Sequence, residues 1–304
     1  MSELTLLTPT PAMERLVLAA ATSRATASAP RVIAPLFTNA GGLAFAKNLL
    51  CSLASARVDY WTVIAMDNAT CSGLQHFTAH DPQHACVAPY ADRPLLSSNA
   101  TSKVQGYRSR AFNLMVMQRP LWVRFLLLQG FAVLQCDTDV VVLRDPLPAF
   151  SEPGNAHRSM LLQSEQVYGY NGGFYFARPT NLTLRLFGEW TRELLRTANS
   201  STFEEQHALV KAIERHMRRM EPTRLSCHQN RHVRSKRGCL ENRTRVFPYW
   251  KLNESEFPNG KIFWRYPGST GKRIAYMCAS HRVPHQRGRA SERLHPSAAC
   301  TPTG

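Results

Sequence analysis

The hydrophobic positions of this chain fall into short continuous runs and longer stretches of helical spacing. Arg31–Thr38, Trp61–Met66 and Phe131–Gln135 are apolar runs that end at turn or acidic residues, so we expect buried strands there, although Pro35 weakens the first. Leu43–Ala56 lies between the first two runs and has the spacing of a helix. This order of strand, turn, helix and strand is typical of an α/β wound sheet.

The same patterns predict the other elements. We expect a helix around Ala12–Ala21, a helix over Arg110–Leu128 with a break at Pro120, strands over Val140–Leu143, Ser159–Gln163, Gly173–Ala177 and Arg245–Tyr249, turns at Tyr170–Gly173 and Asn259–Gly260, helices over Leu182–Arg196 and Phe203–Arg219, and loops over Cys71–Ser102. The 304 residues, 44% of them hydrophobic, suffice for one large α/β domain or two small ones.

The charge of the chain is strongly positive, +16 at neutral pH, and is concentrated in residues 215–245. Such a surface attracts polyanions. Aromatic residues are not interleaved with these arginines, which argues against single-stranded nucleic acid as the partner and leaves a solvated loop or a patch for an acidic acceptor. Without an apolar run of 18 residues or a signal-peptide pattern, we expect no transmembrane segment in this chain.

Cysteines and glycosylation sequons both bear on the compartment. Among eight cysteines there is no CxxC pair, so a zinc ribbon or redox motif is not indicated, whereas Cys71/Cys86 and Cys227/Cys239 could each close a loop in an oxidising compartment. Six asparagines begin an Asn-x-Ser/Thr sequon, namely Asn68, Asn99, Asn181, Asn199, Asn242 and Asn253. This is more than the two or so that chance gives, and favours a luminal history, although polar loops could produce some of them.

The most informative segment is FAVLQCDTDVVVLRDP, residues 131–146. Asp137 and Asp139 stand one residue apart at the end of a buried strand, where two like charges are costly unless a cation compensates them. A hard divalent ion with oxygen ligands would do so and could neutralise a departing diphosphate. The alternative is a turn in which the carboxylates pair with Arg144 or Arg119.

Three further motifs are weaker alone. Asn171-Gly172-Gly173 would let the backbone approach a ligand closely, or would form a hairpin turn. The acidic pair before Gln206 suits a helix N-terminus, and the polar residues after Thr38 suit a nucleotide or an ordinary strand–helix turn. No GxGxxG follows the first strand, and there is no Walker loop or GxSxG, so the dinucleotide, P-loop and serine-hydrolase classes are not indicated.

In this order the motifs resemble a known family. Thr-Asn-x-Gly, Ala-Met-Asp, Asp-x-Asp-Val-Val-x-Leu-Arg-Asp-Pro-Leu-Pro, Asn-Gly-Gly-Phe-Tyr-Phe-Ala, an acidic-Gln pair and a late Phe-Pro-Asn-Gly are similar to the nucleotide-diphospho-sugar transferases of plants and algae, which include extensin arabinosyltransferases and rhamnogalacturonan xylosyltransferases. The resemblance covers roughly residues 12–294 and is specific over 131–177. It implies a single domain with a GT-A type wound mixed sheet flanked by helices, a UDP-sugar donor, Mn²⁺ (or Mg²⁺), retention of anomeric configuration and a Golgi lumen location.

The resemblance also implies boundaries. We expect a tail and helix over residues 1–30 and the transferase domain over 31–294, followed by a tail over 295–304. The domain would comprise a nucleotide-binding half, 31–145, and an acceptor half, 146–294, that contains the basic segment.

Residue roles follow from the matching positions. Asp137 and Asp139 would bind the metal and UDP, and the uridine pocket would be lined by Thr38, Asn39 and Asp67. Arg119 and Glu165 would face the donor, and the floor of the sugar pocket would be Asn171, Gly172 and Gly173. Glu205 and Gln206 would stand at the reacting face.

The sequence departs from the family at the third metal ligand. The usual late His-x-Asn is replaced by Cys278-Ala279-Ser280-His281, so either Cys278 or His281 would complete the site. A thiolate is softer than Mn²⁺ prefers. From the motifs and the resemblance together, the leading hypothesis is a retaining, metal-dependent transferase that moves a pentose or galactose to a glycan or glycoprotein. An inactive family member that binds a glycan or a partner is the alternative, and a basic nucleic-acid-binding protein is the third.

Overall fold

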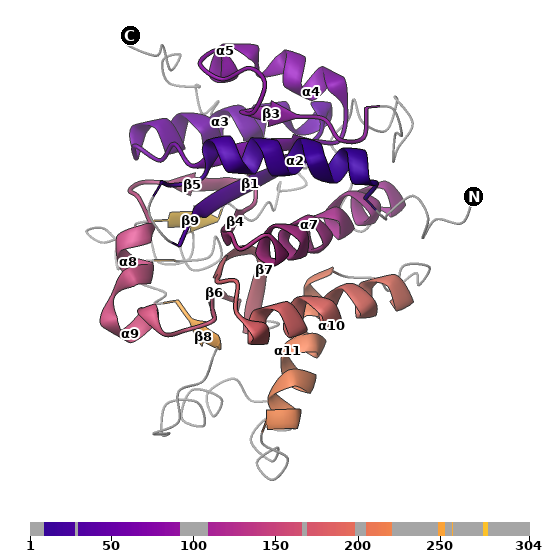
Figure 1. The fold of residues 1–304 in the computed structure, drawn as a ribbon, viewed down its shortest axis with the longest axis vertical. Helices are drawn as coiled ribbons and strands as arrows, with labels where there is room; N and C mark the ends of the chain where they lie inside the picture. The colour runs from indigo at the N-terminus through magenta and orange to yellow at the C-terminus, as the bar shows by residue number, and fades with distance from the viewer. Residues whose placement is uncertain are drawn as a thin grey trace, which may run out of the picture.

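The fold is described by a computed structural model, which covers residues 9–27, 30–91, 109–165, 169–197, 205–220, 249–252, 257 and 276–278. Its centre is a seven-stranded mixed sheet in the order β3-β2-β1-β4-β7-β6-β8 (Figure 1). The strands are β1 (Val32–Thr38), β2 (Trp61–Ala65), β3 (Cys86–Val87), β4 (Ala132–Cys136), β6 (Met160–Glu165), β7 (Gly169–Ala177) and β8 (Tyr249–Lys251). A second, two-stranded sheet joins β5 (Val140–Val142) to β9 (Tyr276–Cys278).

Two layers of helices cover the sheet. One face packs against α2 (Pro11–Arg24), α7 (Arg110–Leu128), α10 (Asn181–Thr197) and α11 (Glu205–Met220), and the other against α3 (Leu43–Ser55), α8 (Leu147–Ser151) and β5. Short helices α4 (Asn68–Gly73), α5 (Gln75–Thr78) and α9 (Pro153–Ala156) and the 3₁₀ turn η1 (Ala40–Gly42) complete the described elements. The predicted architecture, a wound mixed sheet flanked by helices in one domain, is confirmed.

Pro35 stands inside the central strand β1, and the structure shows why it is tolerated. Even-numbered residues of β1 bond to β2, since Ala34 N donates to Tyr60 O. The odd-numbered side faces β4, and that ladder covers only Val32 and Ile33. The missing N–H of Pro35 falls on that side, where the register with β4 ends, while the longer pairing with β2 is kept.

Three predictions about local structure were wrong. Pro120 does not break α7, which runs from Arg110 to Leu128, because Val116 and Trp122 on either side pack into one core and outweigh the lost hydrogen bond. Tyr170–Gly173 is not a turn but part of β7, which pairs with β6 at both of its ends, on either side of a register shift. Cys71–Ser102 is not all loop, since helices and β3 form within it.

Strand positions were predicted closely for β1, β2 and β4, but β5 leaves the main sheet to pair with β9. The predicted turn at Asn259–Gly260 lies outside the described residues, as do Cys227 and Cys239.

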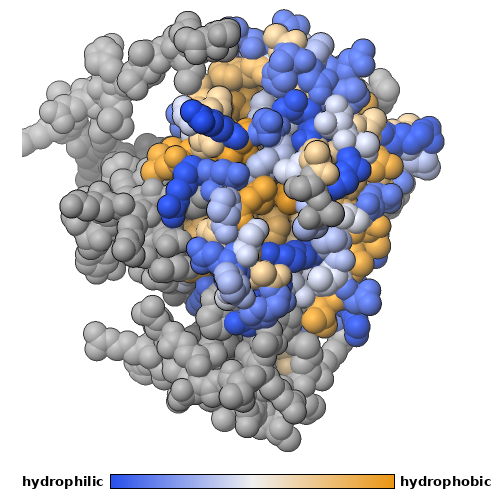
Figure 2. All heavy atoms as spheres, turned by 60° about the vertical axis from the view of Figure 1, so that its left-hand side comes forward, coloured by the Kyte–Doolittle hydropathy of each residue, from blue (hydrophilic) through white to orange (hydrophobic). Residues whose placement is uncertain are grey.

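The exterior is mixed in character. On the described part of the face in Figure 2, hydrophobic areas are interrupted by hydrophilic residues. Among the described helices, none has the length and apolar character needed to cross a membrane.

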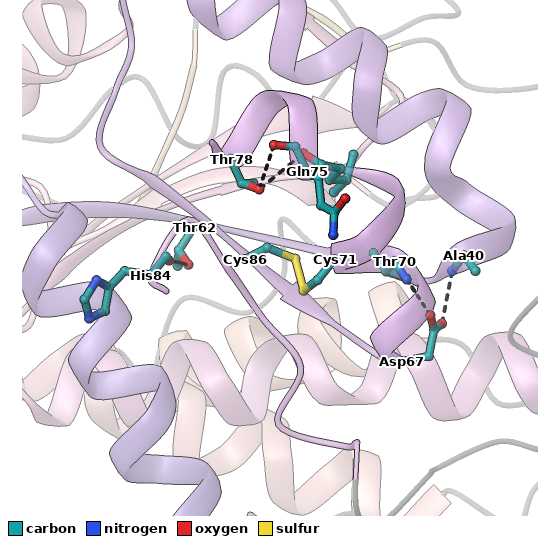
Figure 3. The surroundings of a disulfide bond; sticks show 10 residues. Ala40, Thr62, Asp67, Thr70, Cys71, Gln75, Thr78, His84 and Cys86 are labelled. Atoms are coloured by element: carbon teal, nitrogen blue, oxygen red, sulfur yellow. Dashed lines mark hydrogen bonds between the residues drawn. A yellow bond between two sulfur atoms is a disulfide. The ribbon is translucent and has the colours of Figure 1, made fainter. Parts of the chain in front are cut away.

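The disulfide expected between Cys71 and Cys86 is present and ties α4 to the edge strand β3 (Figure 3). It closes the segment that follows Asp67, whose carboxylate lies close by. A disulfide in this position indicates folding in an oxidising compartment.

Candidate functional site

The predicted donor-site residues gather at one edge of the sheet. Strands β1, β2 and β4 are parallel, so Thr38, Asp67 and Asp137 all stand at or just after carboxyl ends. The chain reverses its order of strands at β1, which lies between β2 and β4. Ligands of wound sheets bind outside the carboxyl ends at such a point.

Asp67 fastens two loops of this edge to each other. Its Oδ2 accepts from Ala40 N at 3.0 Å and its Oδ1 from Thr70 N at 2.8 Å, so it caps α4 and holds the turn after β1 (Figure 3). Asn39 caps that turn in the same way, accepting from Gly42 N at 3.0 Å. The structure thus brings Thr38, Asn39 and Asp67 together, with Thr38 and Asn39 almost fully buried.

Asp137 begins a tight turn at the end of β4. Its N–H donates to Gly173 O of β7 at 2.8 Å, and its carbonyl accepts from Val140 N at 3.1 Å. Burial, together with the charges of Asp137 and Asp139, raises the pKa of the Cys136 thiol well above its usual value, so this cysteine stays protonated. The charges of Asp137 and Asp139 therefore both reach Cys136, the last residue of β4.

Arg119 of α7 bridges two carboxylates from different elements. One guanidinium nitrogen contacts Asp137 Oδ1, and the other donates to Glu205 Oε2 at 3.1 Å. Glu205 is only 5% exposed, and burial raises its pKa to about 7, against the lowering effect of Arg119. Burial alone would lower the pKa of Arg119, but Asp137 and Glu205 raise it, so the guanidinium stays charged.

The glycines of β7 make room for these carboxylates. A Cβ on Gly173 would overlap Asp137 Oδ2, and one on Gly172 would lie 2.9 Å from Glu205 Oε2. Asn171 fixes the same backbone, since its Oδ1 accepts from Gly173 N at 2.7 Å. Glycine is needed at positions 172 and 173 because the carboxylates approach the backbone closely. Backbone conformation is not the reason, because Gly169 is the one residue of β7 with a positive φ.

Gln206 and Gln163 complete the polar surroundings. Gln206 Oε1 accepts from Gly172 N at 3.4 Å, and Gln163 Oε1 accepts from Asn171 Nδ2 at 2.6 Å. Gln163 was not predicted, and neither were two buried residues beneath the carboxylates, Gln135 and Tyr175, which face each other across β4 and β7. A polar residue two positions before Asp137 in an apolar strand was the signal that could have found Gln135.

Four atoms of this cluster are buried and have no hydrogen-bond partner within the described part of the chain. They are Arg119 Nε, Gln135 Oε1, Tyr175 Oη and Glu205 Oε1. Burial and the nearby Glu205 carboxylate raise the pKa of Tyr175, so its hydroxyl remains a donor. Two donors and two acceptors left over in one cluster are suited to a polar ligand or to ordered water.

The sequence comparison decides the family. Residues 56–255, about two thirds of the chain, match the nucleotide-diphospho-sugar transferase family. The chain belongs to this family. The matched span contains Asp137, Glu205 and Asn171–Gly173, which the fold brings together, and it also contains Asp139.

Solved structures of glycosyltransferases resemble this family member only distantly. GlyE of Streptococcus pneumoniae TIGR4 has a TM-score of 0.41 and 12% identity, over 87% of this chain and 58% of its own. The galactosyltransferase LgtC, solved in complex with donor and acceptor sugar analogs, has 0.47 and 10%, over 83% and 87%, and the bifunctional glycosyltransferase WbbM has 0.49 and 10%, over 84% and 47%. The chain thus spans little more than half of GlyE. No curated protein matches the sequence.

The carboxylates of this transferase-family chain fit a hard divalent cation in chemistry. Asp137 and Asp139 are partly exposed at the sheet edge, which suits oxygen ligands of Mn²⁺ or Mg²⁺. The β5–β9 ladder sets the backbone of Cys278 opposite Val140, one residue beyond Asp139. His281 lies outside the described residues, and among those described no group of three potential ligands forms. For Glu165 the structure gives the backbone position, the last residue of β6 opposite Gly169.

Proposed function

We propose that the chain is a retaining, metal-dependent glycosyltransferase. It moves a sugar, a pentose or galactose, from a UDP-sugar to a glycan or glycoprotein acceptor. The observation that carries this proposal is the bridge from Asp137 through Arg119 to Glu205, set against the glycine backbone of β7 at the carboxyl edge of the sheet. The cation Arg119 lies between Asp137, which is assigned to the diphosphate, and Glu205, which is assigned to the reacting face of the sugar. A donor that spans both carboxylates would therefore pass beside this guanidinium.

The donor would lie along this edge. The uridine end is assigned to the pocket formed by Thr38, Asn39 and Asp67, and the sugar to the floor made by Asn171–Gly173. Arg119 would contact the diphosphate or the sugar, because its guanidinium stays charged and its Nε has no partner within the described residues. Glu165, at the end of β6, is assigned to the sugar hydroxyls by the family resemblance.

The metal would be held by Asp137 and Asp139, with Cys278 or His281 as the third ligand. When bound, a divalent cation would stabilise the charge that develops on the departing diphosphate. A cysteine at this position would weaken Mn²⁺ binding, because thiolate is a soft ligand.

Front-face attack is the mechanism that the residues favour. Retention through a covalent intermediate needs a carboxylate nucleophile at the anomeric carbon. Glu205 is paired with Arg119, and its pKa of about 7 leaves it partly protonated at neutral pH, so it is poorly suited to act as a nucleophile. The acceptor hydroxyl would instead give its proton to the departing UDP oxygen, while Gln206, held on the Gly172 N–H, would stabilise positive charge on the sugar.

A Golgi or other secretory location fits the Cys71–Cys86 disulfide and the number of sequons. An acidic glycan acceptor would suit the charge of +16. Plant and algal cell-wall glycoproteins are acceptors that the resemblance suggests.

The deciding experiment is a hydrolysis and transfer screen over UDP-sugars with Mn²⁺ or Mg²⁺. We expect turnover of one donor and its loss in Asp139→Ala. Asp59→Ala is the matched control, because Asp59 is exposed and precedes β2, at the opposite edge of the sheet. No turnover of any donor by the intact chain would refute the enzyme proposal, and full activity of Asp139→Ala would refute the metal assignment.

The inactive-member alternative has one observation in its favour. Arg119 forms an ion pair with Asp137, which is one of the pairings that the sequence offered as the alternative to a metal. The charge of Asp137 is therefore compensated without a cation from solution. Calorimetric titration with UDP in the presence and absence of Mn²⁺ separates the two functions. Binding that needs the metal favours the transferase, and glycan binding without UDP or metal binding favours the alternative.

A further inference from the structure

Two of the six sequons lie in described parts of the chain, and the fold treats them alike. Asn68-Ala69-Thr70 begins α4, and Asn181-Leu182-Thr183 begins α10. In both, the asparagine is exposed and the threonine is fully buried. The asparagine side chains have no hydrogen-bond partner among the described residues.

The position of Asn181 leaves room for a large substituent. Thr180 caps α10 by accepting from Thr183 N at 3.2 Å, so Asn181 is not needed as a cap. Thr183 Oγ1 donates to Ser159 O at 3.1 Å, which anchors the turn from below while Asn181 faces solvent. A group on Asn181 would therefore displace no packed atom.

Asn181 also lies away from the donor site. Strand β7 runs antiparallel to β4, so its end at Ala177 is paired with Val133, near the start of β4. Asn181 follows four residues later, at the edge opposite to Asp137. In Figure 1, α10 covers the lower part of the sheet, and α4 lies at the top.

Asn68 is placed differently. It follows Asp67 directly, on the carboxyl edge where Ala40 and Thr70 converge on the Asp67 carboxylate (Figure 3). A glycan there would stand beside the entrance to the proposed uridine pocket. Only Asn181, of the two, combines exposure with distance from the site.

We propose that Asn181 carries an N-linked glycan. The co-substrate is an oligosaccharide joined to a lipid diphosphate, supplied by the oligosaccharyltransferase of the secretory pathway. A bond forms between Asn181 Nδ2 and the anomeric carbon, the bond from that carbon to the diphosphate oxygen breaks, and the amide loses one proton as the lipid diphosphate leaves. Because Thr183 is buried in the folded helix, the transfer precedes folding of α10.

The Cys71–Cys86 disulfide supports the proposal independently of the sequons, since it indicates folding in an oxidising compartment such as the one where this transfer takes place. The proposal does not depend on transferase activity. An inactive family member made in the same compartment would carry the same glycan.

The test is peptide mapping of the full chain, isolated from its own cells and also secreted from insect cells behind a cleavable signal. Release of N-glycans by an amidase in ¹⁸O water converts an occupied asparagine to labelled aspartate. We expect the label at Asn181, and Asn181→Gln should lose one glycan on a gel. Asn48→Gln, an exposed helical asparagine outside any sequon, is the control and should show no change. An unlabelled Asn181 peptide in the protein from its own cells would overturn the proposal.

Discussion

The buried carboxylate of Glu205 makes a quantitative prediction about how stability depends on pH. Glu205 is 5% exposed, only its Oε2 is bonded to Arg119, and its pKa is raised from 4.5 to about 7, first by burial. Below pH 4.5 the folded and unfolded chains both hold this proton, so it contributes no penalty. Between pH 4.5 and 7 the unfolded chain loses it and the folded chain keeps it, so stability falls as pH rises.

The size of this fall follows from the shift. A difference of about 2.5 pKa units corresponds to about 3 kcal/mol, reached by pH 8. Glu205→Gln cannot lose a proton and should lack this contribution. The change in unfolding free energy from pH 4.5 to pH 8 should therefore be about 3 kcal/mol more favourable in the variant, whatever the constant offset between the two proteins.

Urea unfolding at half-unit pH steps, in EDTA, measures the difference. Comparing slopes removes the titration of other groups, which both proteins share. Glu152→Gln, at an exposed position, is the control and should follow the unsubstituted chain. Parallel curves for Glu205→Gln and the unsubstituted chain would show that Glu205 is already ionised when folded, and that Arg119 outweighs its burial.

Three other predictions follow from the site and the disulfide. Gly173→Ala should lower kcat/KM by about 100-fold, because the new Cβ would overlap Asp137 Oδ2 and displace that carboxylate by about 1 Å. Gly154→Ala is the control, since the space around Gly154 is open, and it should leave kcat/KM unchanged. Equal kinetics of the two variants would refute the close-approach argument. Gln206→Ala should lower kcat with little change in donor KM, and undiminished transfer would remove Gln206 from the mechanism. Replacing Cys71 and Cys86 by serine should cost about 3 kcal/mol in urea unfolding, the value for a loop of their separation, 15 residues; an unchanged midpoint would contradict it.

The sequence alone determined the alternation of strands and helices and most strand positions. Buried apolar runs leave little choice of conformation, so β1, β2 and β4 were placed within a residue or two. It also identified Asp137 as a candidate, because a pair of carboxylates is costly beside a buried strand, and Asn171–Gly173 and Glu205 as candidates through the family resemblance. The family match covers the span in which these candidates lie.

Local pattern failed where distant contacts decide. Asn-Gly-Gly predicts a turn by its own preferences, but it lies within β7 between residues that pair with β6 on both sides, and glycine is required there by the carboxylates that approach it. Pro120 predicts a break by its missing N–H, but α7 is held straight by the shared core on both sides of it.

Only the tertiary structure decided how the candidates act on one another. Arg119 lies 18 residues from Asp137 and 86 residues from Glu205 along the chain, and no spacing rule relates these positions. Strand order, the antiparallel return of β7 and the packing of α7 and α11 on one face bring them within bonding distance. Burial at that meeting point raises the pKa of Glu205, while the two carboxylates beside Arg119 raise the pKa of its guanidinium and keep it charged against the effect of burial.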